Sequence, residues 1–305
     1  MRVGFCLDTD KEDADSGKHK FFIRLAREFE KNGITIDNKN NDVFISLAEM
    51  KTSDTAKVNI LRLDGLILNT RWDYKGKNKK IMKSIKRSDA LIYQGDFCYQ
   101  AYSRFLRVKK EPFAVIPNGS SPKEFLPRSP KNYFLANCKW RPHKRLKDIV
   151  KSFEKALKLG LDADLIITGK PDYEKKHPRI KYLGWQGRDS LMSLMSQAIA
   201  SLHLSWLDWC PNSMVEAIVA KCPIIYSKSG GHTELGEGSG IGIEDTQWNF
   251  KPCDLYSPPE IDRTKIAEAM IKIKNDGINL RDRPDLDIKN VSKKYMSFFN
   301  KLILK

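Results

Sequence analysis

Short apolar segments alternate with longer amphipathic segments along the chain. This pattern predicts parallel β-strands joined by helices that pack on both faces of a sheet. In the first half, strands are expected at 2–7, 43–46, 90–93 and 114–116, with a helix over about 18–32 that ends at Gly33. The second half repeats the pattern, with strands expected at 133–138, 164–168, 180–183, 200–204 and 223–226 and helices over about 146–159, 190–197, 213–221 and 263–275. The fold class is therefore α/β.

A proline-rich segment separates the two series of strands and helices. Residues 117–130 contain four prolines, which limit helix formation and indicate a linker. We expect one domain over 1–125 and a second over 126–286. The last segment, 287–305, places Val291, Tyr295 and Phe299 near helical spacing, so this helix needs a surface to bury against. Ligands of such folds bind at the carboxyl ends of strands and in the crevice between domains.

Composition and charge narrow the class of protein. The 305 residues are 41% hydrophobic and 30% charged, and no run of 18 apolar residues occurs, which argues against a disordered or membrane-spanning chain. Lys and Arg number 54 against 38 Asp and Glu, a net charge of +16 that favours an anionic partner: a nucleic acid, a phosphorylated metabolite or an acidic membrane surface. Six scattered cysteines without a CxxC pair, and a start that lacks a signal-peptide pattern, predict a cytoplasmic protein with reduced thiols.

Several common motifs are missing. The sequence has neither a GxxxxGK[ST] P-loop nor a GxGxxG after its first strand, and it has no GxSxG or HExxH. The acidic stretch 8–16 departs from the EF-hand pattern, because Asp13 and His19 occupy its sixth and twelfth positions. That stretch also contains a short DxD pattern, but a solvated acidic loop is the better interpretation. Each of the five histidines is interpreted as a surface or core residue rather than a metal ligand.

The first segment with candidate chemistry is 138–146, directly after a predicted strand and before a predicted helix. Four cations, Lys139, Arg141, Lys144 and Arg145, are expected to converge at the end of the strand. A diphosphate bound there would meet both these cations and the amides of the helix N-terminus. The alternative is that they are simply solvated charges.

Three further segments fit the same purpose. Asp208 and Glu216 lie on either side of a strand-to-helix turn at Asn212 and Ser213, where a helix N-terminus can take phosphate oxygens and Glu216 can accept from two vicinal ribose hydroxyls. The alternative is a loop charge and a glutamate that complements the helix dipole. A turn with Gly230, Gly231 and Glu234 follows the next strand, and an Ile-Pro-Asn-Gly turn stands at 116–119; glycines there permit close backbone approach to a ligand, although ordinary connecting turns explain them too.

In their order and spacing, these segments resemble the retaining family 4 glycosyltransferases of the GT-B fold. The resemblance covers most of the chain, from the Ser16-Gly17 loop to the last helix. It implies two Rossmann-like domains facing a central cleft, an acceptor-side domain at 1–125, a nucleotide-sugar-binding domain at 126–286, and a helix at 287–305 that crosses back to the first domain. The implied activity is sugar transfer from a nucleotide-sugar to a glycan, lipid or other hydroxyl acceptor.

The resemblance also assigns roles to residues. It implies catalytic roles for Lys139, Lys144, Asp208 and Glu216, donor-binding roles for Gly17, Arg141, Asn212, Ser213, Gly230, Gly231 and Glu234, and an acceptor contact for Asp64, for which a turn aspartate is an equal alternative. The sequence departs from the family pattern twice. Asp208 stands where the family has glutamate, which shortens the reach by one methylene, and Pro211 stands where the family often has glycine, which removes one backbone donor.

The implied chemistry needs stabilisation of a departing diphosphate, which Lys139 and Lys144 can supply in place of a divalent metal. We therefore expect no metal and no other cofactor to be obligatory. The run 71–87 holds eight cations and one acid, which predicts a solvated helix face, or else contact with anionic lipid or an acidic glycan. A nucleotide-sugar epimerase of similar fold remains an alternative, and a basic nucleic-acid-binding protein, which the net charge would also explain, is a weaker one. Nucleic acid is not expected as a partner, since no RRM, KH or zinc-finger pattern occurs.

Overall fold

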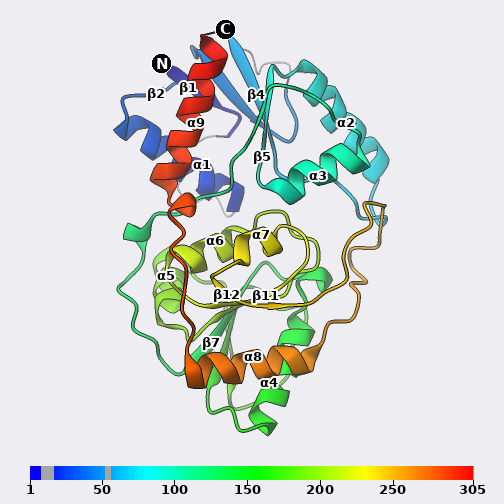
Figure 1. The fold of residues 1–305 in the computed structure, drawn as a ribbon, viewed down its shortest axis with the longest axis vertical. Helices are drawn as coiled ribbons and strands as arrows, with labels where there is room; N and C mark the ends of the chain where they lie inside the picture. Colours follow the sequence, from blue (N-terminus) through cyan, green and yellow to red (C-terminus); the bar gives the residue numbers. More distant parts are fainter. Residues whose placement is uncertain (8–16, 52–55, 305) are drawn as a thin grey trace. The chain divides into compact units, whose positions relative to one another are not determined.

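The computed structural model describes residues 1–7, 17–51 and 56–304 and divides the chain into two compact units (Figure 1). Unit 1 comprises Met1–Ser121, Phe250–Pro252 and Pro284–Lys305, and unit 2 comprises Pro122–Asn249 and Cys253–Arg283. The acidic stretch 8–16, with its DxD pattern, lies outside the described residues. Each unit is an α/β structure built on a parallel sheet, as the alternation of apolar and amphipathic segments predicts.

Unit 1 contains six parallel strands in the order β2-β1-β3-β4-β5-β6. The strands are β1 (Arg2–Phe5), β2 (Thr35–Ile36), β3 (Val43–Leu47), β4 (Val58–Leu63), β5 (Ala90–Tyr93) and β6 (Phe113–Val115), joined by α1 (Gly17–Lys31), α2 (Tyr74–Arg87) and α3 (Asp96–Phe105). The whole of β5 is buried, as in sheets with both faces covered, where strands are continuously apolar instead of alternating.

The last helix, α9 (Ile288–Ile303), belongs to unit 1. It begins after Asp287, whose carboxylate accepts from the backbone N–H of Lys289 at 3.0 Å. Tyr295 and Phe299 then join the core of the unit, where the rings of Phe29 and Phe299 lie 5.7 Å apart at 68°. The apolar stripe predicted for this helix therefore buries against α1 and the first sheet, and the chain returns to its first unit as expected.

The junction turn contacts the start of α9. An added Cβ at Gly119 would lie 2.9 Å from Val291 Cγ2 and 3.0 Å from Ile288 Cα, so only glycine fits beside the helix. The next residue, Ser120, accepts a hydrogen bond from the backbone N–H of Ile288 at 3.0 Å. Within unit 1, the glycine of the 116–119 turn thus serves the packing of α9.

Unit 2 contains six parallel strands in the order β12-β11-β10-β7-β8-β9. The strands are β7 (Tyr133–Asn137), β8 (Asp164–Thr168), β9 (Ile180–Gly184), β10 (Ser201–His203), β11 (Ile224–Ser227) and β12 (Gly240–Ile243), and the helices are α4 (Leu146–Lys158), α5 (Arg188–Gln197), α6 (Asn212–Val219), α7 (His232–Gly236) and α8 (Arg263–Asp276).

The strand order places three of the candidate segments at one edge of the second sheet. Strands β7, β10 and β11 are neighbours and run parallel, so their carboxyl ends at Asn137, His203 and Ser227 lie along the same edge. The loops that follow these strands contain Lys139 and Lys144, then Asp208, then Gly230 and Gly231. This is the edge at which α/β proteins bind ligands.

Candidate active site

Lys144 and Asp208 form an ion pair at the carboxyl edge of the second sheet. Lys144 ends the short 3₁₀ turn Pro142–Lys144 that follows β7, and Asp208 lies in the loop that follows β10. The side chains are 15% and 16% exposed, so the pair is largely shielded from water. Two residues that the sequence assigned to one site are therefore in direct contact.

The contact decides the protonation of both groups. Burial acts to raise the pKa of Asp208, but the ammonium of Lys144, helped by its hydrogen bond, holds that pKa well below its usual range. Burial likewise acts to lower the pKa of Lys144, and the carboxylate of Asp208 raises it instead. Both groups are therefore charged at neutral pH, and the pair carries no net charge of its own.

Two further cations of this loop are unpaired. Lys139 and Arg141 are exposed, and across residues 1–7, 17–51 and 56–304 their cationic groups form no ion pair or hydrogen bond. They belong to the same loop as Lys144, and Arg145, the N-cap residue of α4, makes no side-chain cap hydrogen bond to that helix. An anionic ligand at this edge would meet two cations that no carboxylate already neutralises.

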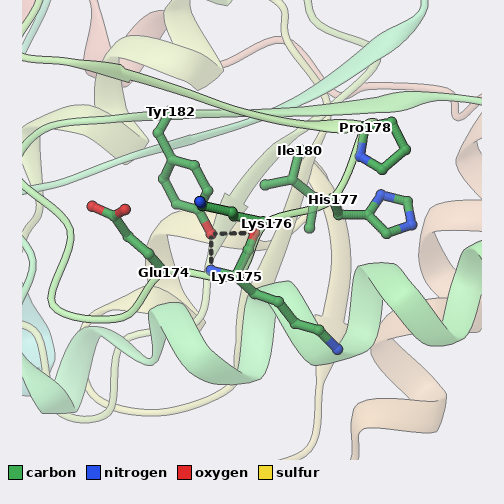
Figure 2. A pocket seen from close by; sticks show the side chains of 7 residues that line it. All are labelled: Glu174, Lys175, Lys176, His177, Pro178, Ile180 and Tyr182. Atoms are coloured by element: carbon green, nitrogen blue, oxygen red, sulfur yellow. Dashed lines mark hydrogen bonds between the residues drawn. The ribbon is translucent and has the colours of Figure 1, made fainter.

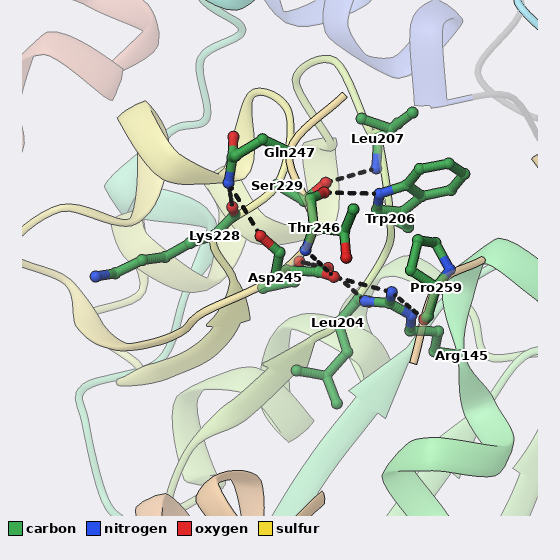
Figure 3. Close-up of polar contacts among 11 residues, drawn as sticks. Arg145, Leu204, Trp206, Leu207, Lys228, Ser229, Asp245, Thr246, Gln247 and Pro259 are labelled. Carbon is green, nitrogen blue, oxygen red and sulfur yellow. Dashed lines mark hydrogen bonds and ion pairs between the residues drawn. The ribbon is translucent and has the colours of Figure 1, made fainter. Parts of the chain in front are cut away.

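The fourth cation of the loop, Arg145, corrects the sequence interpretation. Its guanidinium is completely buried and makes a two-point ion pair with Asp245, with Nη1 2.5 Å from Oδ2 and Nη2 3.1 Å from Oδ1 (Figure 3). It also donates to the backbone oxygen of Pro259 at 2.7 Å, while Asp245 accepts from the hydroxyl of Ser227 at 2.6 Å. Arg145 thus ties the loop to β11 and to the chain after β12, and it is not available to a diphosphate.

The second predicted carboxylate, Glu216, lies on α6, which begins at Asn212. Glu216 is 7% exposed, whereas Asn212 and Ser213 are half-buried in the first turn of the helix. Pro211 occupies the N-cap position, and its backbone oxygen accepts from Val215 at 3.2 Å. The helix therefore begins where the sequence predicts it, with Asn212 and Ser213 at its positive end.

The turn after β11 packs closely against the loop of Asp208. Gly231 donates its backbone N–H to the oxygen of Asp208 at 2.8 Å, and an added Cβ on Gly231 would lie 1.7 Å from the oxygen of Trp209. At Gly230, φ is +62° and an added Cβ would lie 2.6 Å from the Asp208 oxygen. The two glycines therefore allow this turn to pack closely against the loop that positions Asp208. The close approach that they permit is to the protein itself.

Three buried histidines surround the ion pair, and the sequence analysis gave them no role. Burial is the main cause that lowers the pKa of His143 and His203 to about 3 and that of His232 to about 4. Within the described part of the chain, each has at least one ring nitrogen without a hydrogen-bond partner. Their positions in the sequence could have indicated this: His203 ends β10, His143 lies in the 3₁₀ turn after β7, and His232 begins α7 after β11, all at the same edge of the sheet.

Three predicted residues remain, two in unit 1 and one in unit 2. Asp64 belongs to unit 1, where its side chain is 3% exposed and binds both Arg62 and Gln94. Gly17 is the first residue of α1, in the same unit. Glu234 is half-buried on α7, three residues after Gly231 in unit 2.

A pocket of about 460 Å³ lies at the loop that leads into β9 (Figure 2). Its lining mixes charges of both signs from 174–177 around the ring of Tyr182, whose hydroxyl accepts from the backbone N–H of Lys175 at 3.0 Å. Because β9 starts at Ile180, this pocket lies toward the amino ends of the strands, at the edge opposite the Lys144–Asp208 pair. It contains none of the predicted site residues.

The family comparison favours one class of protein. Residues 129–276 match the family model Glycosyl transferases group 1. The matched segment spans both Lys144 and Asp208 and most of unit 2, and it supports a glycosyltransferase. No curated protein sequence matches the chain.

Solved structures of similar fold cover the whole chain. Sucrose-phosphate synthase from Thermosynechococcus elongatus is similar with a TM-score of 0.73 at 12% identity, over 100% of this chain and 99% of that one. The Anabaena protein HepE in complex with UDP has a TM-score of 0.69 at 14% identity, over 99% of this chain and 100% of that one. AviGT4, a glycosyltransferase involved in avilamycin A biosynthesis, has a TM-score of 0.65 at 13% identity, over 99% of this chain and 98% of that one. The expected α/β fold of GT-B type, with its two parallel sheets, is confirmed.

Within 1–7, 17–51 and 56–304, no helix is long and apolar enough to cross a membrane. The same residues contain no group of three or more His, Cys, Asp or Glu side chains placed to hold a metal ion.

Proposed function

We propose that the protein is a retaining glycosyltransferase of family 4, which transfers a sugar from a nucleotide-sugar donor to a hydroxyl group of a glycan or lipid acceptor. The observation that carries this proposal is the Lys144–Asp208 ion pair beside the unpaired Lys139 and Arg141, inside the segment that matches the Glycosyl transferases group 1 model. The HepE structures contain UDP and UDP-glucose, which supports a nucleotide-sugar donor.

In this proposal, Lys139, Arg141 and Lys144 of the loop after β7 bind the diphosphate of the donor. Lys139 and Arg141 supply charge that no side chain has neutralised, and Lys144 is held in one orientation by Asp208. Charges fixed before the reaction stabilise a departing anion more than charges that must first reorganise, and the shielded position of Lys144 strengthens its effect. These groups do the work of a divalent metal, so we propose that none is obligatory.

The reaction leaves the configuration at the anomeric carbon unchanged. The bond from this carbon to the diphosphate oxygen breaks, and the acceptor oxygen forms a bond to it from the same face. The acceptor proton passes to the departing diphosphate oxygen, so no carboxylate nucleophile takes part. Asp208 lies beside the donor sugar, and Glu216 accepts from the ribose hydroxyls. Asp64 is proposed for acceptor contact.

We further propose that α2 holds the protein on an anionic membrane while it uses a lipid-linked acceptor. Seven of its side chains are exposed cations, at 75, 77, 79, 80, 83, 86 and 87, and the helix contains no acidic residue. Trp72 stands before the helix at 36% exposure, with Lys77 Nζ 5.1 Å from its ring centroid. Each such cation near an anionic surface contributes about 1 kcal/mol to membrane binding.

Thermal-shift measurement against UDP-, GDP-, ADP- and TDP-sugars tests the donor, since a ligand that binds only the folded state raises the melting temperature. The stabilising donor is then incubated with candidate acceptors, with and without EDTA, and the product anomer is identified by NMR. We expect transfer with retained configuration in EDTA. Conversion of the donor without acceptor would indicate the epimerase instead. Inverted configuration, or activity lost in EDTA and restored by a metal, would each refute that part of the proposal.

A further inference from the structure

A groove in unit 1 is lined by none of the residues assigned to sugar transfer. It has a volume of about 690 Å³ and is formed by residues 112–116, which include β6, and by one side of α9. Phe298 and Leu302 of the helix line it together with the apolar side chains of the strand. Strand β6 is the last strand of the first sheet and is three residues long.

The charged groups of the groove are all of one sign. Lys293, Lys294 and Lys301 line it and are exposed, and none of the acidic residues that the structure describes lines it. None of these three ammonium groups forms an ion pair with any residue that the structure describes. A partner that fits must therefore combine acidic groups with an apolar part.

The strand adds backbone groups to the groove. Among the strands that the structure describes, β6 pairs only with β5. The hydrogen bonds from Leu91 N to Pro112 O, 3.1 Å, and from Ile116 N to Tyr93 O, 2.8 Å, follow the parallel pattern. In that pattern alternate residues of β6 pair with β5. The backbone groups of Phe113 and Val115 therefore face the open edge, where an extended chain can pair with them.

We propose that this groove binds an extended acidic peptide segment of a partner protein, which adds a strand beside β6. Lys293 and Lys301 are eight residues apart on a helix, which is about 12 Å along its axis. In an extended chain, side chains four positions apart lie on the same face at about 13 Å. The segment recognised therefore has acidic residues at positions i and i+4, with an apolar residue at i+2 over Phe298 and Leu302.

A fluorescein-labelled peptide, Ser-Asp-Thr-Leu-Thr-Asp-Ser, tests this proposal by fluorescence anisotropy on the full chain. We expect saturable binding. A control peptide in which the five central residues are rearranged to Asp-Asp-Thr-Thr-Leu should bind at least tenfold more weakly. Two further peptides are N-methylated, each on one of the two alternating sets of backbone amides. Only one set faces β6, so methylation of that set should weaken binding at least tenfold, whereas methylation of the other set should weaken it less than threefold. Equal effects of the two methylated peptides would refute strand pairing.

Charge-reversed variants locate the site. K293E/K301E should weaken peptide binding at least tenfold, and the milder K293Q/K301Q about fivefold. K272E/K289E changes the charge equally outside the groove and should have less than a threefold effect. Equal losses in the two reversed variants would show unspecific attraction and overturn the proposal. Vesicles containing phosphatidylglycerol that bind through Lys293 and Lys301, while the peptide does not bind, would overturn it in favour of a lipid surface.

Discussion

Lys144 and Asp208 form an ion pair although 64 positions separate them in the sequence. They belong to the loops after β7 and β10, which are neighbouring parallel strands, so the sheet itself brings the two loops together. The turn at Gly230 and Gly231, after the next strand, packs on the loop of Asp208 from its other side. The orientation of Lys144 is therefore set by the fold before any ligand arrives.

Removal of one partner of this pair should damage both stability and transfer. D208N leaves the largely buried ammonium of Lys144 without its counter-ion, and we expect the free energy of unfolding to fall by about 3 kcal/mol. K144Q removes a charge that stabilises the leaving diphosphate, and we expect kcat to fall at least about 100-fold. Urea unfolding and a transfer assay measure the two effects.

The control for this pair is K158Q, which removes an exposed lysine of α4 and should change neither quantity. The double variant K144Q/D208N should be more stable than D208N, because no unpaired charge then remains buried. Additive losses of stability in the double variant would contradict the contact.

Substitution of Lys139 or Arg141 should weaken ligand binding and leave the stability of the protein nearly unchanged. Neither cation has a partner among the described residues, so K139Q and R141Q should change the free energy of unfolding by less than about 0.5 kcal/mol. Each should weaken binding of the donor nucleotide about tenfold, the loss of one charge-assisted hydrogen bond. Isothermal titration with the nucleoside diphosphate measures this effect. A loss of stability without a loss of affinity would mean that these residues support the loop instead.

Most strands and helices could be predicted from the sequence because their apolar patterns are local. Strand β8 begins and ends at the predicted residues, and the last helix begins one residue late, at Ile288. Strand β12 was missed because its sequence, Gly-Ile-Gly-Ile, has low strand propensity. An added Cβ on Gly240 would lie 1.8 Å from the oxygen of Ile224, so the glycine is required by close packing of β12 on β11. Such a requirement arises only in the folded sheet.

The candidate site was predictable in its location but not in its contacts. The cations after β7 and the carboxylate after β10 follow strand ends, which the sequence reveals. Arg145 resembles its neighbours in sequence, yet its partner Asp245 is 100 positions away, and only the three-dimensional fold distinguishes a buried structural arginine from one that can bind phosphate. The buried histidines were overlooked for the same reason, because burial depends on contacts between distant segments.

Gly231 should be intolerant of any side chain. In G231A the new Cβ would overlap the oxygen of Trp209, so the turn must move away from the loop of Asp208, and we expect the free energy of unfolding to fall by about 3 kcal/mol. The matched control is G187A, because Gly187 has φ −62° and an added Cβ there meets nothing within 4 Å. That variant should stay within about 0.5 kcal/mol of the native protein or gain slightly. Urea unfolding compares the two, and equal stability would contradict the packing described.

The buried histidines should make the protein sensitive to mild acid. His143, His203 and His232 have pKa values of about 3, 3 and 4 in the folded protein, against 6.5 when exposed, so the unfolded chain binds more protons at acid pH. Their contribution to stability is complete above pH 6.5 and is lost as the pH falls through 6.5 toward 4, at up to about 1.4 kcal/mol per pH unit for each histidine.

Urea unfolding at pH 7.5, 6.5, 5.5 and 4.5 measures this slope, and H203L should reduce it by about a third. The pKa of Asp208 is also lowered, but this carboxylate changes the pH dependence of stability only below about pH 4. It therefore does not affect the range from pH 7.5 to 4.5. A free energy of unfolding that stays constant from pH 7.5 to 4.5 would show that these histidines take up protons in the folded protein.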